Sequence, residues 1–102
     1  MELRQIRHFV MVAEEGHFGR AAERLSISQP ALSSSIQRLE QDFGIRLFER
    51  DSKSVRISLA GRLVLDYARA LINGAERTKN FVQALGAGQV GRLEIGFNST
   101  VL

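Results

Sequence analysis

The 102-residue sequence predicts a mainly α-helical fold with three short helices, a two-stranded β hairpin and one long helix. Three observations support this prediction. Apolar residues recur at three- and four-residue steps as far as Phe43, which is the spacing of one helix face. Short extended segments follow between Gly44 and Ser58. Helical spacing then returns and continues to Leu85.

The first predicted helix begins at Leu3 and has one apolar side. Its apolar residues are Leu3, Ile6, Phe9, Val10 and Ala13. Glu14, Glu15 and Gly16 close the helix, because glycine readily adopts the left-handed conformation that caps a helix. We therefore expect this side to face a core.

A short second helix follows and is joined to a third by three residues. Its apolar residues are Phe18, Ala21, Ala22 and Leu25, and the joining residues are Ser26, Ile27 and Ser28. Ser28 is a favourable N-cap, and Pro30 falls in the first turn, where its missing N–H costs little. The third helix is therefore expected to begin near Gln29 and to end at Gly44.

The third helix has two distinct faces. The apolar face consists of Leu32, Ile36, Leu39 and Phe43, and the outer face consists of Gln29, Pro30, Ser33, Ser34, Gln37 and Gln41. Two helices joined by a tight turn, the second with a short-polar outer face, predict a helix-turn-helix over about residues 18–37.

Two short strands are predicted next, Leu47 to Arg50 and Val55 to Ser58, with a polar tip between them. This hairpin is expected to form a wing, which completes a winged helix-turn-helix domain over residues 1–58. Arg50 and Lys53 are its candidate cations for contact with a polyanion. In the alternative interpretation, Arg50 pairs with Glu49 or Asp51 and only orders the wing.

The long helix is expected over residues 59–86, with Ser58 as its cap. Its apolar residues alternate steps of four and three, as in a coiled coil. They are Val64, Ala68, Leu71, Ala75, Thr78, Val82 and Leu85. At about 1.5 Å per residue the helix extends roughly 40 Å, so we expect this seam to pack against a second copy of the chain. Residues 87–91 are expected to form a hinge, and residues 92–102 the first strand of a domain that the chain does not contain.

Composition excludes several function classes. The chain has no cysteine and two histidines, so neither disulfides nor thiolate metal sites are expected, and His8 has no metal-ligand partner at a fixed step. No glycine-rich phosphate loop starts a helix. We therefore expect no enzyme activity, no metal and no cofactor in this fragment. No signal peptide or membrane span is recognised, which predicts a cytoplasmic protein. The net charge of +3 alone decides nothing.

The outer face of the third helix carries the chemistry for base recognition. Gln29 has an amide suited to bidentate pairing with adenine, and the hydroxyls of Ser33 and Ser34 suit several bases. Helix composition alone leaves the alternative open that this is an ordinary solvated face.

A wider resemblance bears on this choice. The stretch AAERLSISQPALSSSIQRLE followed by DFGIRLFER resembles the helix-turn-helix signature of LysR-type transcriptional regulators, and the resemblance extends from Leu3 to Phe97. It implies that Gln29, Pro30, Ser33 and Ser34 contact bases and phosphates in the major groove. It also implies that Arg50 and Lys53 serve at the wing, and that the linker helix dimerises antiparallel.

The sequence departs from this family pattern in two places. His17 and Gly19 stand where the family has hydroxyl residues beside the phenylalanine, so the hydroxyl that caps the helix or contacts phosphate is missing. His17 is the candidate for a phosphate contact there, and the alternative is a solvated side chain. Ser34 and Ser35 follow Ser33 where the family has longer polar side chains.

Three arginines of the predicted helices have two possible roles each. Arg20 and Arg24 are candidates for contact with the phosphate backbone, or they form a solvated face with Glu23. Arg38 is expected to pair locally with Glu40 and Asp42.

These observations predict sequence-specific binding of double-stranded DNA by a homodimer, and they leave a tetramer open for a longer protein. The expected target is a pseudo-palindromic operator, and the expected role is transcription regulation in response to a small molecule sensed by the absent domain. The alternative is a winged-helix interaction module that dimerises without binding DNA.

Overall fold

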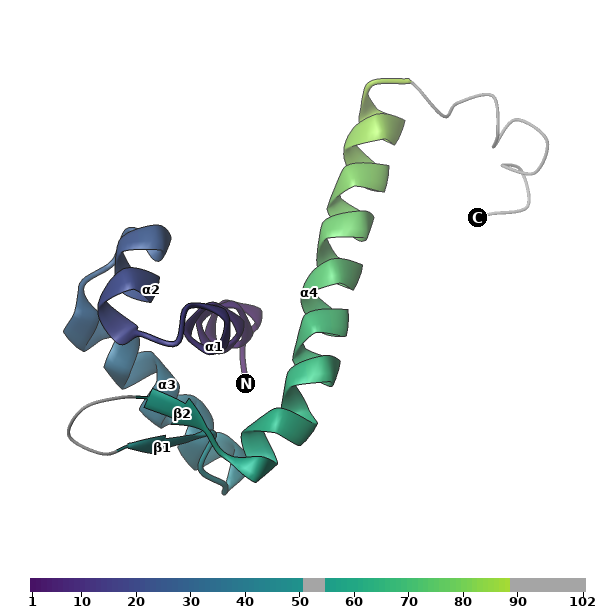
Figure 1. Ribbon diagram of the computed structural model, residues 1–102. Helices are drawn as coiled ribbons and strands as arrows, with labels where there is room; N and C mark the ends of the chain where they lie inside the picture. Colours follow the sequence, from purple (N-terminus) through teal and green to yellow (C-terminus); the bar gives the residue numbers. More distant parts are fainter. Residues whose placement is uncertain (51–54, 89–102) are drawn as a thin grey trace. The chain divides into compact units, whose positions relative to one another are not determined.

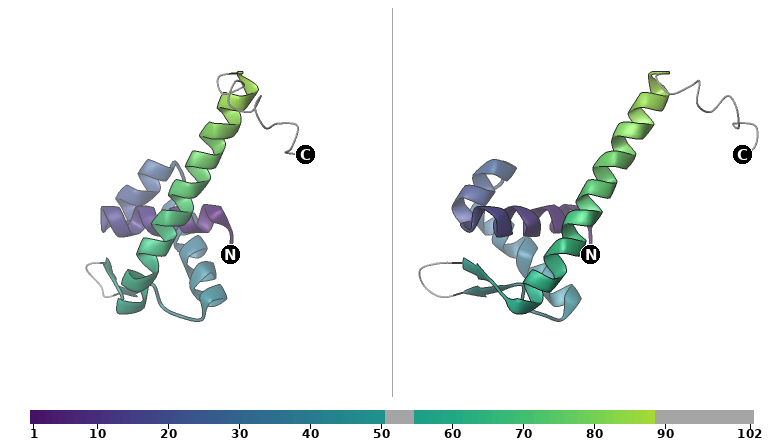
Figure 2. Two further views of the ribbon diagram at one scale, coloured as in Figure 1. Left: turned by 90° about the vertical axis from the view of Figure 1, so that its right-hand side faces the viewer. Right: turned by 45° about the vertical axis from the view of Figure 1, so that its right-hand side comes forward.

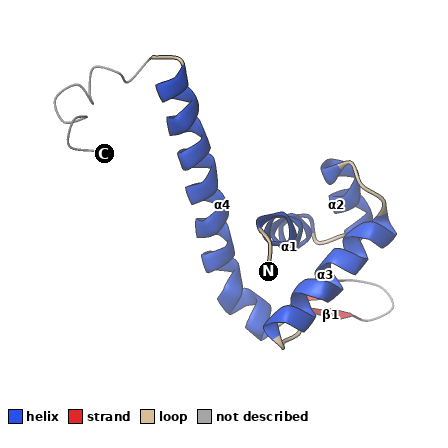
Figure 3. Cartoon of the chain, turned by 180° about the vertical axis from the view of Figure 1, so that it is seen from behind, coloured by secondary structure: helices blue, strands red, loops and turns tan. Residues whose placement is uncertain are grey.

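The computed structural model describes residues 1–50 and 55–88 (Figure 1). Its elements are α1 (Leu3–Glu15), α2 (Phe18–Leu25), α3 (Gln29–Phe43), β1 (Phe48–Arg50), β2 (Val55–Ile57) and α4 (Leu59–Gly86). The chain forms two compact units, Met1–Ile72 and Asn73–Leu102, so the first unit includes the first turns of α4. This architecture confirms the predicted mainly helical fold with a two-stranded wing, which Figure 3 shows by secondary structure.

The helix ends follow from the capping residues. Gly16 and Gly44 adopt left-handed conformations, with φ of 66° and 72°, and end α1 and α3 as predicted. Ser26 ends α2 in the same conformation at φ 58°, which serine adopts only rarely. The side chain of Ser28 caps α3. The three-residue turn between α2 and α3 is therefore confirmed.

The core of the first unit lies between α1, α2, α3 and the strands, and Figure 2 shows the ribbons of these elements in two further views. Its largest fully buried side chains are Phe9, Phe48, Ile6, Leu32, Ile36, Leu39, Leu47 and Val12. Phe48 meets Phe9 edge to face, with ring centroids 5.5 Å apart, and Phe18 in the same manner at 6.1 Å. One strand residue therefore packs against two helices of the domain.

The wing is an antiparallel pair joined firmly to α3 and α4. Phe48 pairs with Ile57, and Arg50 with Val55. The buried carboxylate of Glu40 accepts hydrogen bonds from the backbone N–H groups of Leu47, at 2.8 Å, and of Phe48, at 3.3 Å. These bonds fix the start of β1 against the end of α3. The predicted strands were each one residue too long, at Leu47 and at Ser58.

The first turns of α4 belong to the core of the first unit. Gly61 and Ala68 are buried, and Val64, Leu65 and Ile72 pack against the same core. Ala68 is only 1% exposed, so the prediction that it faces a partner helix is wrong, and Val64 is also turned towards its own domain. Apolar residues at alternating steps of four and three indicate that one face of a helix is buried. They do not indicate whether that face packs against its own domain or against a partner.

The second unit is described here only as far as Gly88. Within α4 the Thr78 hydroxyl donates a hydrogen bond to the carbonyl oxygen of Gly74 at 2.8 Å, so this polar residue of the predicted seam is satisfied within its own helix. Residues 89–91 of the predicted hinge and residues 92–102, with the predicted strand, lie outside the described residues. In the described ranges no helix is long and apolar enough to cross a membrane.

Candidate nucleic-acid interface

The outward face of α3 carries short polar side chains on a helix whose orientation is fixed. The hydroxyl of Ser28 accepts a hydrogen bond from the backbone N–H of Ala31 at 3.2 Å, and Pro30 lies in the first turn. The residues of this face are exposed or half-buried, and they are Gln29, Pro30, Ser33, Ser34 and Gln37. Because the opposite face is buried in the core, α3 cannot rotate about its axis, and this face stays directed outwards.

The chemistry of this face matches the edges of base pairs. The face has amide and hydroxyl groups, which donate and accept hydrogen bonds, and no carboxylate that would repel phosphate. An α-helix fits the major groove of B-form DNA, where each base pair presents a distinct pattern of donors and acceptors. The face can therefore enter the groove without an electrostatic penalty from its own side chains.

His17 begins α2 and acts as its N-cap. Its Nδ1 accepts a hydrogen bond from the backbone N–H of Arg20 at 3.0 Å. The imidazole thus performs the capping role for which the sequence lacks a hydroxyl. Because Nδ1 is the acceptor, this bond requires the ring proton to be on Nε2, which leaves an N–H donor at Nε2 of an exposed residue. The predicted phosphate contact of His17 stays a prediction, now with a defined donor atom.

Gly19 makes room for this imidazole. A Cβ atom at position 19 would lie 2.9 Å from Cε1 and 3.2 Å from Nδ1 of His17, and 3.5 Å from Oε1 of Gln29. His17 and Gly19 are therefore one coupled feature, because the glycine leaves the space that the capping imidazole occupies. The first turn of α2 therefore lies close to Gln29, the first residue of α3.

This coupling predicts that the effect of Gly19→Ala depends on His17. In the natural chain, alanine gains helix propensity but displaces the imidazole from its cap, and each effect is worth about 1 kcal/mol, so they nearly cancel. With His17→Ser no ring is displaced, and Gly19→Ala should stabilise the protein by about 0.5–1 kcal/mol. Urea unfolding of the four variants measures the coupling energy, and strictly additive effects would contradict the proposed contact.

Arg20 and Arg24 are arranged around one carboxylate of α1. Arg24 Nη1 lies 2.7 Å from Glu15 Oε2, and Arg20 Nε lies 3.6 Å from Glu15 Oε1. Arg20 also donates to the backbone oxygen of Glu15 at 3.2 Å. Glu15, rather than Glu23, is thus their acidic neighbour. The Arg20 side chain is 60% exposed, so it keeps donors for a phosphate beside the start of α2.

Arg38 differs from its predicted role. In the part of the chain that the structure describes, it forms no ion pair with Glu40 or Asp42. The Asp42 carboxylate lies 3.2 Å from the amino group of Met1, and Glu40 is buried against the wing. The prediction of local pairing is therefore wrong, because both carboxylates are engaged elsewhere, and the guanidinium of Arg38 is exposed.

In the wing, the structure describes the two strands but not the cationic side chains that the sequence predicts at its tip. The backbone of Arg50 ends β1, whereas its side chain and the whole of Lys53 lie outside the described residues.

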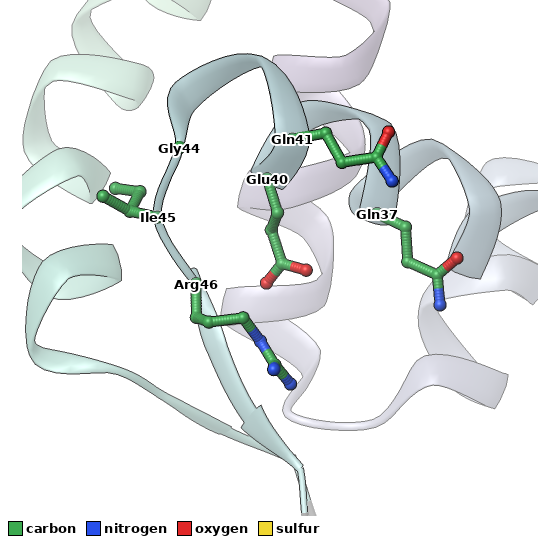
Figure 4. Close-up of a pocket in the computed structure, with 6 residues that line it drawn as sticks. All are labelled: Gln37, Glu40, Gln41, Gly44, Ile45 and Arg46. Atoms are coloured by element: carbon green, nitrogen blue, oxygen red, sulfur yellow. The ribbon is translucent and has the colours of Figure 1, made fainter.

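A shallow cavity of about 480 Å³ lies at the junction of α3 with the wing, lined by Gln37, Glu40, Gln41, Gly44, Ile45 and Arg46 (Figure 4). The Glu40 carboxylate there binds backbone amides, so this cavity belongs to the joint that holds the wing. In the described ranges no cluster of three metal-ligating side chains occurs.

Comparison with known proteins identifies the family of this arrangement. A family model described as bacterial regulatory helix-turn-helix protein, LysR family, matches residues 3–62. The chain belongs to the LysR family. The predicted resemblance is thus confirmed, and with it the classification of the chain among helix-turn-helix transcription regulators.

Several LysR-family relatives match over nearly the whole chain. The SDS degradation transcriptional activation protein of Pseudomonas sp. is 48% identical over 95 residues, which is 93% of this chain and 31% of that protein. The transcriptional regulator ClcR of Pseudomonas putida is 44% identical over 102 residues, which is 100% of this chain and 35% of ClcR. The chain thus spans about a third of the length of these LysR-family relatives.

Solved structures of LysR-family proteins share the fold. The complex of the BenM DNA-binding domain with catB site 1 DNA matches with a TM-score of 0.80 at 40% identity, over 84% of this chain and 96% of that one. Full-length CbnR with its target DNA matches with a TM-score of 0.77 at 38% identity, over 82% of this chain and 28% of that one. The winged helix-turn-helix with a long following helix is therefore the fold of this chain.

Proposed function

We propose that this chain is the DNA-binding part of a transcription regulator and that it reads double-stranded DNA as a dimer through the outward face of α3. The observation that carries the proposal is a capped helix that presents Gln29, Ser33 and Ser34 outwards, with no carboxylate beside them. That the BenM domain and CbnR were each solved with DNA supports the same use of this fold.

Each part of the interface has a distinct role in this proposal. Gln29, Ser33 and Ser34 contact base edges, and Pro30 allows α3 to begin close to the DNA. The exposed donors of His17 and Arg20 bind the phosphate backbone at the start of α2. Following the resemblance, the wing contributes the side chains of Arg50 and Lys53.

Dimerisation through α4 is the second part of the proposal. Large apolar side chains on α4 are exposed, which is costly in water unless a partner covers them. They are Leu59, Leu63, Tyr67 and Leu71 in the first unit, and Phe81, Val82 and Leu85 in the second. Two copies of α3 would then bind half-sites about 34 Å apart, or a multiple of that spacing, in a pseudo-palindromic operator.

The response to a small-molecule effector is proposed for a longer protein. The LysR-family relatives are about three times the length of this chain, which leaves room for a sensing domain beyond residue 91. Binding to chromosomal operators implies that the regulator works in the cytoplasm, and we propose no cofactor or enzyme activity for this part.

The test is enrichment of random-sequence DNA by the 102-residue chain at two salt concentrations. We expect an inverted repeat whose affinity falls with salt, because phosphate contacts release counterions. The double variant Ser33→Glu and Ser34→Glu should weaken binding by about 100-fold, because it loses base contacts and adds charge repulsion.

A matched control adds the same charge elsewhere. Asn80→Glu with Gln83→Glu introduces two carboxylates at exposed positions of α4 and should bind like the natural chain. If the Ser33 and Ser34 variant binds DNA normally, α3 is not the reading element. If the folded dimer enriches no sequence, the alternative interaction module becomes the better interpretation.

A further inference from the structure

A second polar cavity lies beside α3, on the side of α1. It has a volume of about 380 Å³, and its polar lining comes from Arg4, Gln5, His8, Ser34, Ser35 and Arg38. None of the residues that line it is acidic. The outer face of α3 therefore continues, through Ser34, into a hollow whose charged groups are all cationic.

The two guanidiniums of this cavity are uncommitted. Within the described parts of the chain, neither Arg4 nor Arg38 forms an ion pair, and both are exposed. Asp42, one turn beyond Arg38, is held by the amino group of Met1. Two neighbouring cations without a counter-ion repel each other, so an anion placed between them is stabilised by both.

The floor of the cavity is fixed by a bond between α1 and α3. His8 Nδ1 lies 2.7 Å from the hydroxyl of Ser35, and the His8 residue is only 8% exposed. Burial lowers the pKa of His8, and the positive charge of Arg4 lowers it further. His8 is therefore a neutral positioning residue near pH 7, and the charge of the cavity resides in the two arginines.

The position of the cavity indicates which anion it meets. Gly19 of α2 borders Gln29 on one edge of the outer face of α3, whereas Ser34 and Arg38, one turn apart, border the opposite edge. A helix in the major groove has a sugar-phosphate backbone on each side. His17 and Arg20 lie at the first edge, and the cavity lies where the backbone on the other side would pass.

We propose that the cavity between α1 and α3 binds a phosphate group of the DNA backbone through the guanidiniums of Arg4 and Arg38. The proposal rests on the proposed DNA-binding function. Guanidinium groups present paired N–H donors that match phosphate oxygens, and the Ser34 hydroxyl at the mouth of the cavity adds one more donor. With a backbone contact at both edges, α3 is clamped in the groove although its own reading face has no cation.

The test measures the salt dependence of binding to one duplex that contains the enriched site. The slope of log affinity against log salt is negative, and Arg4→Gln with Arg38→Gln should make it shallower by about 0.9, which corresponds to one phosphate contact. The loss should be similar on specific and random duplexes, because a backbone contact has no sequence preference. Arg69→Gln with Lys79→Gln removes the same charge from α4 and should keep the slope. Thermal unfolding of each variant verifies that it is folded.

A local measurement separates a contact from a general loss of charge. The ring signals of His8 in the 102-residue chain are followed by NMR with the duplex and, separately, with inorganic phosphate at constant ionic strength. We expect the duplex to raise the pKa of His8, because a phosphate offsets the charge of Arg4. If Arg4→Gln with Arg38→Gln shows the same salt slope as the control Arg69→Gln with Lys79→Gln, the proposal is wrong. A response to inorganic phosphate together with unchanged slopes would assign the cavity to a free anion, which also overturns it.

Failure of the proposed function has a different signature. If the natural chain binds no duplex at any salt concentration, both the proposed function and this contact are wrong. If the natural chain binds DNA, Ser33→Glu with Ser34→Glu abolishes binding and the arginine variants retain the full slope, only the contact in the cavity is wrong.

Discussion

Replacing Gly61 with alanine is expected to destabilise the first unit by about 3 kcal/mol or more, at the upper end of what overpacking costs. A Cβ atom there would overlap the carbonyl oxygen of Leu47, and it would lie 3.1 Å from the carbonyl carbon of Leu47 and 2.9 Å from Cγ1 of Ile57. The first contact is with backbone, so no change of rotamer relieves it. The start of α4 must therefore move away from the strands.

This movement would break a connected set of hydrogen bonds. The Ser58 hydroxyl donates to the carbonyl oxygen of Arg46 at 2.6 Å and accepts from the N–H of Gly61 at 2.8 Å. The N–H of Ser58 donates to the carbonyl oxygen of Leu47 at 2.9 Å. Buried polar groups that lose such partners cost about 1–3 kcal/mol each, which adds to the steric penalty.

Urea unfolding of Gly61→Ala measures the expected loss, and Gly74→Ala is the matched control. A Cβ at position 74 meets only the side chain of Arg77, at 3.8 Å, an ordinary contact. That variant should be more stable by about 0.5–1 kcal/mol, because alanine is the better helix former. Equal stability of Gly61→Ala and the natural chain would contradict the close approach of α4 to the strands.

The sequence predicted the helix-turn-helix well because its boundaries are determined locally. Gly16, Ser28 and Gly44 each cap the helix beside them, and caps depend on residues within a few positions. The strand ends were less accurate, because Leu47 and Ser58 form the joints of the wing with α3 and α4 instead of extending the ladder. Such joints depend on contacts across the fold.

The features that the sequence did not predict all depend on distant or paired residues. Gly61 resembles an ordinary helix glycine until Leu47 is placed against it. His17 can cap α2 because Gly19 leaves room for its ring. Arg38 is not paired with Asp42 because the amino group of Met1 binds that carboxylate. The cavity beside α3 likewise exists only when α1 packs on it. Periodicity reports which side of a helix is apolar, and it contains no information on such contacts.

The largest ambiguity concerned the partner-facing side of α4. The predicted seam includes Ala68, which is buried in the core of the first unit. By contrast, Leu59, Leu63 and Tyr67 follow one another at four-residue steps and are 72%, 68% and 77% exposed. A seam counted every 3.5 residues drifts around a helix of 3.6 residues per turn, so sequence alone does not separate two apolar faces of one helix.

The exposed apolar residues predict the largest change in DNA affinity. Leu63→Glu with Tyr67→Glu should produce a folded monomer, because two carboxylates would be buried against an apolar partner surface at high cost. A monomer binds one half-site only, and loss of the second, linked contact should lower the affinity for the full operator by about 100- to 1,000-fold. Its affinity for a duplex with a single half-site should stay unchanged.

Light scattering and duplex titration decide between the two faces of α4. The control Asn80→Glu with Gln83→Glu adds the same charge to α4 and should remain dimeric. Val82→Glu tests the seam first predicted from the sequence, since the exposed Val82 belongs to that seam and not to the four-residue series through Leu63 and Tyr67. If Val82→Glu separates the subunits while Leu63→Glu with Tyr67→Glu does not, the partner covers the predicted seam. The exposed residues near Leu63 would then need another explanation.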